Sequence, residues 1–113
     1  MAINSKQKGA RFERLLASKL REDGYDTRRT AQYCGKNGGA ADVAGLPYIH
    51  IEAKHQERMQ LYDWMAQAKR DAKSGQIPAV FHKRNNSNIL VTLELDEFMQ
   101  IYREFEAGKD EQQ

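Results

Sequence analysis

The chain has 113 residues, of which 40% are hydrophobic and 30% charged, which fits one globular domain and argues against wholesale disorder. No run approaches the ~20 apolar residues of a membrane helix, and the N-terminus has no apolar run that could serve as a signal peptide, so we expect no membrane partner. Cys34 is the one cysteine, which excludes an intrachain disulfide and fits the cytoplasm. The net charge of +2 is uneven, since residues 1–41 hold nine Lys/Arg against four Asp/Glu and residues 94–113 hold two against seven. The basic first third either binds a phosphate backbone or is ordinary solvated surface.

The first predicted element is a helix. Asn4 or Ser5 can cap its start, and it is expected to run to about Asp23, where Gly24 supplies a C-terminal stop. Its apolar residues recur at spacings of a helical repeat and therefore share one face, which is expected to pack against the rest of the domain. These residues are Phe12, Leu15, Leu16 and Leu20.

Three strands are expected before the next helix. Tyr25 to Ala31 is rich in Tyr and Thr and predicts a strand, and the glycine-rich Gln32 to Ala41 predicts a flexible loop. Asp42 to Leu46 predicts a short strand that ends in a turn at Pro47. Tyr48 to Lys54 alternates apolar and polar residues and is the strongest strand signal in the chain.

The second half of the chain is expected to begin with a helix, followed by two strands. A helix is expected from about Gln60 to Ser74, ending at Gly75, and two strands, Ile77 to Lys83 and Ile89 to Leu95, are expected to form a hairpin around an asparagine-rich turn. The apolar face of this helix comprises Leu61, Trp64, Met65, Ala68 and Ala72.

A third helix closes the predicted order. Asp96 is expected to cap it, and the residues from Gly108 onward are expected to fray. Its apolar face consists of Phe98, Ile101, Tyr102 and Phe105. The resulting order, α-β-β-β-α-β-β-α, contains one strand–helix–strand unit and therefore predicts one parallel crossover inside an otherwise antiparallel sheet.

The strand Tyr48 to Lys54 carries the first candidate catalytic residues. Because side chains alternate along a strand, Glu52 and Lys54 share one face with His50, roughly 6.5 Å apart from Cα to Cα. At that separation the carboxylate can hold a metal ion while the ammonium reaches a water molecule on it. The alternative is a salt bridge on a solvated face.

Two further carboxylates lie upstream. A tight connection after Asp42 would bring it alongside Glu52, where the two would repel unless a cation such as Mg²⁺ lay between them; alternatively Asp42 only begins a strand. Glu13 lies at the edge of the apolar stripe of the first helix. It is either a third metal ligand or a flanking helical glutamate paired with Lys6, Lys8 or Arg11.

Four segments together resemble the PD-(D/E)XK nuclease superfamily and, more closely, the archaeal-type Holliday junction resolvases and their phage-encoded relatives. The resemblance covers about residues 6–95. The segments that carry it are Lys8-Gly9-x-x-Phe12-Glu13, Arg28-Arg29-Thr30-Ala31, Asp42-Val43 and Ile51-Glu52-Ala53-Lys54. Ala41 stands where the superfamily name has a proline, and His55 stands where a serine is common; His55 either touches phosphate or simply ends the strand.

The resemblance implies an α/β fold with a restriction-endonuclease-like, mixed five-stranded sheet flanked by helices. It also implies that Glu13, Asp42 and Glu52 bind Mg²⁺, with Mn²⁺ as a plausible substitute, and that Lys54 assists the attacking water. Gln67 matches a glutamine that family members often carry near the active site; alternatively it is an exposed helical glutamine. The chain would be a single nuclease domain over residues 1–113, acting in a bacterial or phage-infected cell.

The expected substrate is DNA, held by basic residues that position a backbone without reading sequence. These are Lys6, Lys8, Arg11, Arg28, Arg29 and Lys36. The first interpretation is a Mg²⁺-dependent Holliday junction resolvase that acts as a homodimer, since a four-way junction has near two-fold symmetry and needs two cuts. Phe81, Trp64, Tyr62 and the third helix are candidates for the pairing surface. The alternatives are a flap, nicking or repair nuclease on the same fold, or a non-catalytic DNA-binding module.

Overall fold

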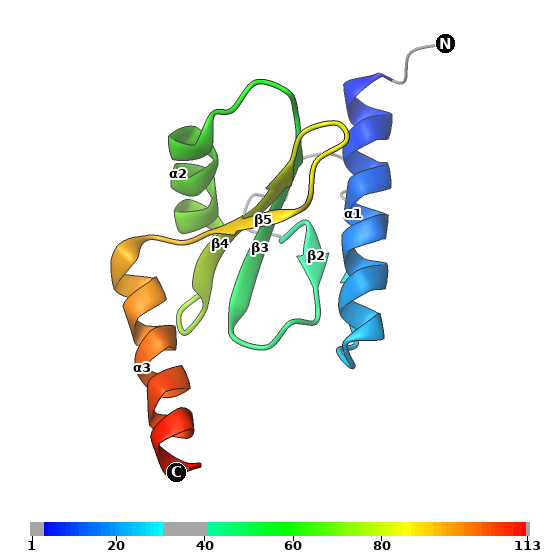
Figure 1. Cartoon of the computed structure of the whole chain (residues 1–113). Coiled ribbons are helices and arrows are strands. Elements are labelled where there is room, and N and C mark those ends of the chain that lie inside the picture. Colours follow the sequence, from blue (N-terminus) through cyan, green and yellow to red (C-terminus); the bar gives the residue numbers. More distant parts are fainter. Residues whose placement is uncertain (1–3, 31–40, 113) are drawn as a thin grey trace.

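The computed structural model describes residues 4–30 and 41–112, which form three helices and one sheet (Figure 1). Most of the predicted loop, with Cys34 and Lys36, lies outside these ranges. The elements are α1 (Ser5–Glu22), β1 (Arg28–Arg29), β2 (Val43–Ala44), β3 (Ile49–His55), α2 (Leu61–Asp71), β4 (Ile77–Lys83), β5 (Leu90–Thr92) and α3 (Leu95–Glu111).

The sheet has the predicted mixed topology. Its strand order is β1-β2-β3-β4-β5; β3 and β4 are parallel, and the other neighbouring pairs are antiparallel. The parallel pair has α2 as its crossover, because parallel strands cannot be joined by a tight turn. The predicted α/β class, element order and single crossover are therefore confirmed.

Several element boundaries differ from prediction. The strands β1, β2 and β5 are two or three residues long, shorter than the predicted ranges 25–31, 42–46 and 89–95. Helix α2 ends at Asp71 rather than Ser74 because Ala72 is extended, with ψ 138°. Glu94 rather than Asp96 occupies the N-cap of α3, and Asp96 lies in the first helical turn. Boundaries are decided by tertiary pairing, which local sequence patterns report poorly.

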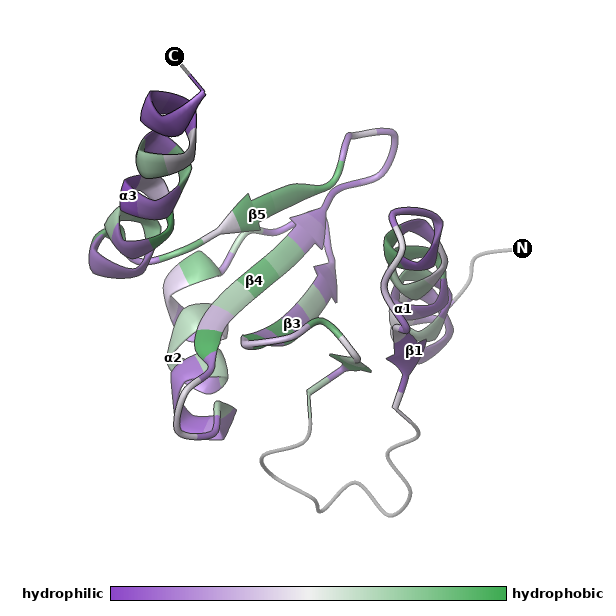
Figure 2. Cartoon of the chain, turned by 90° about the horizontal axis from the view of Figure 1, so that it is seen from below, coloured by the Kyte–Doolittle hydropathy of each residue, from purple (hydrophilic) through white to green (hydrophobic). Residues whose placement is uncertain are grey.

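The two faces of the sheet are covered by different helices (Figure 2). Helix α1 packs its buried Phe12, Leu16 and Ala17 on the face that carries Ile51 and Phe81. Helix α2 packs on the other face, around Val80. Leu15, expected in the buried face of α1, is 40% exposed. In the described ranges, none of the helices combines the length and apolar character needed to cross a bilayer.

Helix α3 has the expected apolar face, but nothing in the described part of the chain buries it. Figure 1 shows this helix projecting away from the sheet. Phe98 is 48% exposed and Phe105 is 57% exposed. Among the other candidate pairing residues, Phe81 and Trp64 are buried in the core, whereas Tyr62 is 94% exposed. The helix continues to Glu111, and fraying from Gly108 stays a prediction.

Gly45, directly after β2, allows a test of how closely the backbone there approaches the segment before β1. It has φ +107°, and a Cβ there would lie 2.0 Å from the Asp26 carbonyl oxygen. We expect Gly45→Ala to lower the free energy of unfolding by more than ~2 kcal/mol, because backbone must shift as well as adopt an unfavourable φ. Gly24→Ala is the matched control, since Gly24 has φ +103° but no neighbour within 4 Å of such a Cβ. Urea unfolding that gives equal losses for both variants would contradict the close approach.

Candidate active site

The central strand β3 places Glu52 and Lys54 on the same face of the sheet. Glu52 Oε2 lies 3.7 Å from Lys54 Nζ, and the Glu52 side chain is only 2% exposed, against 22% for Lys54. This face is not solvated, because α2 covers it. The pair is therefore partly buried, with the lysine side chain partly exposed and the glutamate side chain almost fully buried.

Asp42 lies against β3 through both its backbone and its side chain. Its N–H donates to Ile51 O at 3.0 Å, and its Oδ2 accepts from the Ala53 N–H at 2.8 Å. The antiparallel pairing of Val43 with Ile51 sets this register. The connection through Pro47 thus brings Asp42 beside Glu52, as the spacing suggested.

Glu13 reaches the same region from α1. Its Oε1 accepts from Arg29 Nε at 2.7 Å, so its partner is a residue of β1 rather than one of the helical cations considered from sequence. The Thr27 hydroxyl, which donates to Ala17 O at 2.7 Å, fixes the chain leading into β1 on α1 and so places Arg29 against Glu13. The Glu13 side chain is 17% exposed.

The electrostatics of Asp42 show how these carboxylates act on one another. Its pKa is raised from 3.8 to about 7, first by burial and then by the negative charge of Glu52, with a smaller contribution from Glu13. The hydrogen bond from Ala53 and the charge of Lys54 oppose the rise. Three carboxylates gathered so closely that the charges of Glu52 and Glu13 raise the pKa of Asp42 offer oxygen donors that fit a hard divalent cation such as Mg²⁺.

The raised pKa of Asp42 makes the stability of the metal-free protein depend on pH. Between pH ~4 and ~7 the folded state retains a proton that the unfolded chain has lost, so stability falls as pH rises through this window. We expect wild type to lose on the order of 2–4 kcal/mol relative to Asp42→Asn across it. Chemical unfolding in EDTA at several pH values measures this difference, with Asp63→Asn on the exposed face of α2 as the control. Parallel pH profiles for wild type and Asp42→Asn would contradict the raised pKa.

Next to Glu52 lies a pair of residues whose role the sequence did not suggest. His50 is 1% exposed, and its Nε2 lies 3.6 Å from Glu52 Oε1. Asp71, from the last turn of α2, brings a carboxylate oxygen to the same place: the ligand atoms of His50, Glu52 and Asp71 all lie within 4.8 Å of one another. The available signal was helical spacing, since Asp71 follows Gln67 by four residues and so shares its stripe of α2.

The other predicted site residues are distributed around this cluster. Gln67 is half-buried on α2, and its catalytic role stays a prediction. Lys6 and Arg28 are exposed, and Lys8 Nζ lies 3.8 Å from Glu57 Oε2. Lys36 lies outside the described residues. The structure thus brings Glu13, Asp42, Glu52 and Lys54 together, and the described basic residues lie on α1 and β1, with Arg29 in contact with Glu13.

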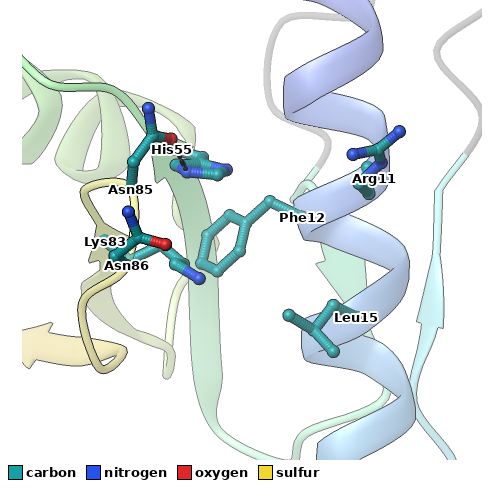
Figure 3. Close-up of a pocket in the computed structure, with 7 residues that line it drawn as sticks. All are labelled: Arg11, Phe12, Leu15, His55, Lys83, Asn85 and Asn86. Atoms are coloured by element: carbon teal, nitrogen blue, oxygen red, sulfur yellow. Dashed lines mark hydrogen bonds between the residues drawn. The ribbon is translucent and has the colours of Figure 1, made fainter. Parts of the chain in front are cut away.

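A second feature is a hollow at the carboxyl ends of β3 and β4, on the side of α1 (Figure 3). Its volume is about 460 Å³, and cationic, amide and apolar side chains line it together. His55 Nε2 lies 3.0 Å from Asn85 Oδ1, and burial, together with the charges of Lys8 and Lys83, lowers the pKa of His55. The lining residues are Arg11, Phe12, Leu15, His55, Lys83, Asn85 and Asn86.

Comparisons with known proteins bear on the family and the fold of the chain. A family model described as "Phage putative PDDEXK endonuclease" matches residues 4–110. Among solved structures, the chain is similar to Hjc, a Holliday junction resolvase from the archaeal hyperthermophile Archaeoglobus fulgidus, with a TM-score of 0.61 and 23% identity over 75% of this chain and 76% of that one. At that identity the likeness establishes a shared fold. No curated protein matches the chain.

Proposed function

The chain belongs to the phage PDDEXK endonuclease family, and from that premise we propose that it is a Mg²⁺-dependent, structure-specific endodeoxyribonuclease, most specifically a Holliday junction resolvase acting as a homodimer. The observation that carries the proposal is the convergence of three carboxylates and one lysine from α1, the residue before β2, and β3. Asp42 and Glu52 lie close enough for the charge of one to raise the pKa of the other, and Lys54 stands 3.7 Å from Glu52.

The proposed roles follow from the chemistry of phosphodiester hydrolysis. Asp42 and Glu52, helped by Glu13, would hold the divalent cation. When bound, the cation neutralises charge that develops on the phosphate and lowers the pKa of water. Lys54, whose side chain is partly exposed, would orient the attacking water or donate to the scissile phosphate through its ammonium. The expected products carry 5′-phosphate and 3′-hydroxyl ends.

DNA binding is assigned to the basic residues around the cluster. His55 directly follows Lys54, so the hollow of Figure 3 lies at the same end of β3 as the proposed catalytic lysine. Arg11 and Lys83, which line the hollow, can hold a backbone phosphate, and the Asn85 and Asn86 amides can donate to it. Arg29 is engaged by Glu13, so we assign it mainly to positioning that carboxylate.

We expect Arg11→Gln and Lys83→Gln each to weaken binding to junctions of unrelated sequence by about the same factor. Each lost phosphate contact should also make the slope of log K against log salt shallower by roughly one. Arg103→Gln is the charge-matched control, because Arg103 is exposed on the acidic helix α3. Fluorescence anisotropy over a salt series measures both quantities. A loss restricted to particular sequences would instead indicate base readout.

Three other nuclease classes and one binding class compete with the resolvase. A flap, nicking or repair nuclease would use the same catalytic cluster, whereas a binding module would not cut. Cleavage rates on a four-way junction, a flap and a linear duplex, all in Mg²⁺, separate these possibilities. The proposal predicts the fastest cutting at the junction; a preference for the flap would favour the runner-up, and binding without cutting of any substrate would favour the module.

The proposed homodimer is supported by symmetry and by the exposed apolar surface. A four-way junction needs two cuts, and one chain offers one Glu13/Asp42/Glu52/Lys54 cluster. Helix α3 presents large apolar side chains that no described element covers, and a second copy is the partner that the substrate itself suggests.

A further inference from the structure

A second set of metal-ligating side chains adjoins the proposed catalytic cluster and shares only Glu52 with it. It comprises His50 on β3, Glu52, and Asp71 at the end of α2. His50 and Glu52 are almost completely buried, with side chains 1% and 2% exposed. The two oxygens of Glu52 face different neighbours, since Oε1 lies 3.6 Å from His50 Nε2 and Oε2 lies 3.7 Å from Lys54 Nζ.

A separate observation that points to a bound ion is the lack of a hydrogen-bond partner for the buried His50 Nε2 among the described residues. The 3.6 Å to Glu52 Oε1 is too long for an N–H···O hydrogen bond. A buried polar atom without a partner costs free energy and is uncommon, so its presence calls for a physical reason.

The spacing of the three groups suits a metal ion. With bonds of roughly 2.0–2.2 Å, two ligands of a tetrahedral Zn²⁺ stand about 3.4 Å apart. The observed 3.6 Å between Nε2 and Oε1 is near that value, and the third ligand atom lies within 4.8 Å of both. One imidazole nitrogen with two carboxylate oxygens leaves a fourth position for water.

We propose that His50, Glu52 and Asp71 bind a divalent transition-metal ion of the Zn²⁺ class. An imidazole ligand favours such an ion over Mg²⁺, which prefers an all-oxygen shell. An ion there would give His50 Nε2 a partner and would balance the negative charges of Glu52 and Asp71. It would also hold Glu52 through Oε1, while Oε2 faces Lys54. The metal binding stands on its own geometry. Only the consequence for DNA cleavage, that a fixed Glu52 holds the catalytic cation better, rests on the proposed function.

The test is a Zn²⁺ titration of metal-free protein by isothermal calorimetry. Wild type is expected to bind Zn²⁺, and both His50→Gln and Asp71→Asn are expected to weaken that binding at least about tenfold. Two matched controls should bind as wild type does. His82→Gln alters another buried histidine, one that already contacts Thr92 Oγ1 at 2.8 Å, and Asp63→Asn removes an exposed carboxylate of the same helix. Asp71 is only half-buried, so Asp71→Asn keeps the test valid if His50→Gln fails to fold.

Asp42→Asn separates this inference from the proposed function, because Asp42 is not one of the three ligands. It should retain this Zn²⁺ binding while losing cleavage in Mg²⁺. A wild type that cuts DNA but does not bind Zn²⁺, or variants at His50 and Asp71 that bind it unchanged, would overturn the inference and leave the nuclease assignment standing. Zn²⁺ binding that depends on His50, in a protein that cuts no DNA, would support this inference and overturn the nuclease assignment.

Discussion

Asp42→Asn and Glu52→Gln are each expected to reduce cleavage of a four-way junction at least about 10³-fold, which corresponds to about 4 kcal/mol of transition-state stabilisation. The reason is that each change removes one negative charge from the cluster proposed to hold the cation. Binding of the junction should persist, because DNA contact is assigned to the basic residues. It should even tighten as repulsion between the cluster and phosphate falls.

Both substitutions are close to isosteric, so loss of activity would not reflect loss of fold. The Asn side chain still offers an oxygen to the Ala53 N–H that now donates to Asp42 Oδ2. Asp63→Asn, on the exposed surface of α2, is the matched control and should cut as wild type does. Single-turnover cleavage and anisotropy on the same junction separate catalysis from binding. If both amide variants cut at near wild-type rates, the assigned cluster is wrong.

Mixing wild type with an excess of Asp42→Asn is expected to convert paired cutting into single nicks. One chain carries one cluster, and a two-fold dimer would hold both clusters on the junction, which makes the second cut effectively intramolecular. Random pairing of subunits leaves doubly active dimers in proportion to the square of the wild-type fraction. The readout is a supercoiled plasmid that extrudes a cruciform, since paired cuts linearise it and single cuts only relax it.

The dimer experiment has its own control. Mixing wild type with an excess of Asp63→Asn should leave the ratio of linear to nicked plasmid unchanged, because every heterodimer then retains two active clusters. The mass in solution at micromolar concentration should be about twice that of one chain. If Asp42→Asn leaves the ratio unchanged although subunit exchange is confirmed, coordinated cutting by a dimer is wrong, and a nicking or flap nuclease becomes the better interpretation.

Much of the fold could be predicted because the sequence carries strong local patterns. The alternation from Tyr48 to Lys54 indicated β3, and the strand–helix–strand order indicated the parallel pairing with β4. The short connection at Pro47 predicted that Asp42, just before β2, would lie beside Glu52 of β3. The boundaries of α2 and of β5 were wrong because they depend on partners that are distant in sequence.

The surroundings of the cluster could not be predicted in the same way. Alternation showed that Glu52 and His50 share a face, but not that α2 buries it. Asp71 reaches Glu52 only through the packing of that helix, and Arg29 reaches Glu13 only through the docking of β1 on α1. The partner of an ionisable side chain is set by tertiary geometry, which local periodicity does not encode.

The most direct test of the central claim is the metal dependence of cleavage. A synthetic four-way junction with one end-labelled strand is incubated with metal-free protein, with and without Mg²⁺, and the products are resolved by length. The account predicts discrete cuts near the branch point with 5′-phosphate ends in Mg²⁺, and intact strands in EDTA. Equal cutting in EDTA, or an intact junction in Mg²⁺ despite tight binding, would contradict a nuclease built on Glu13, Asp42, Glu52 and Lys54.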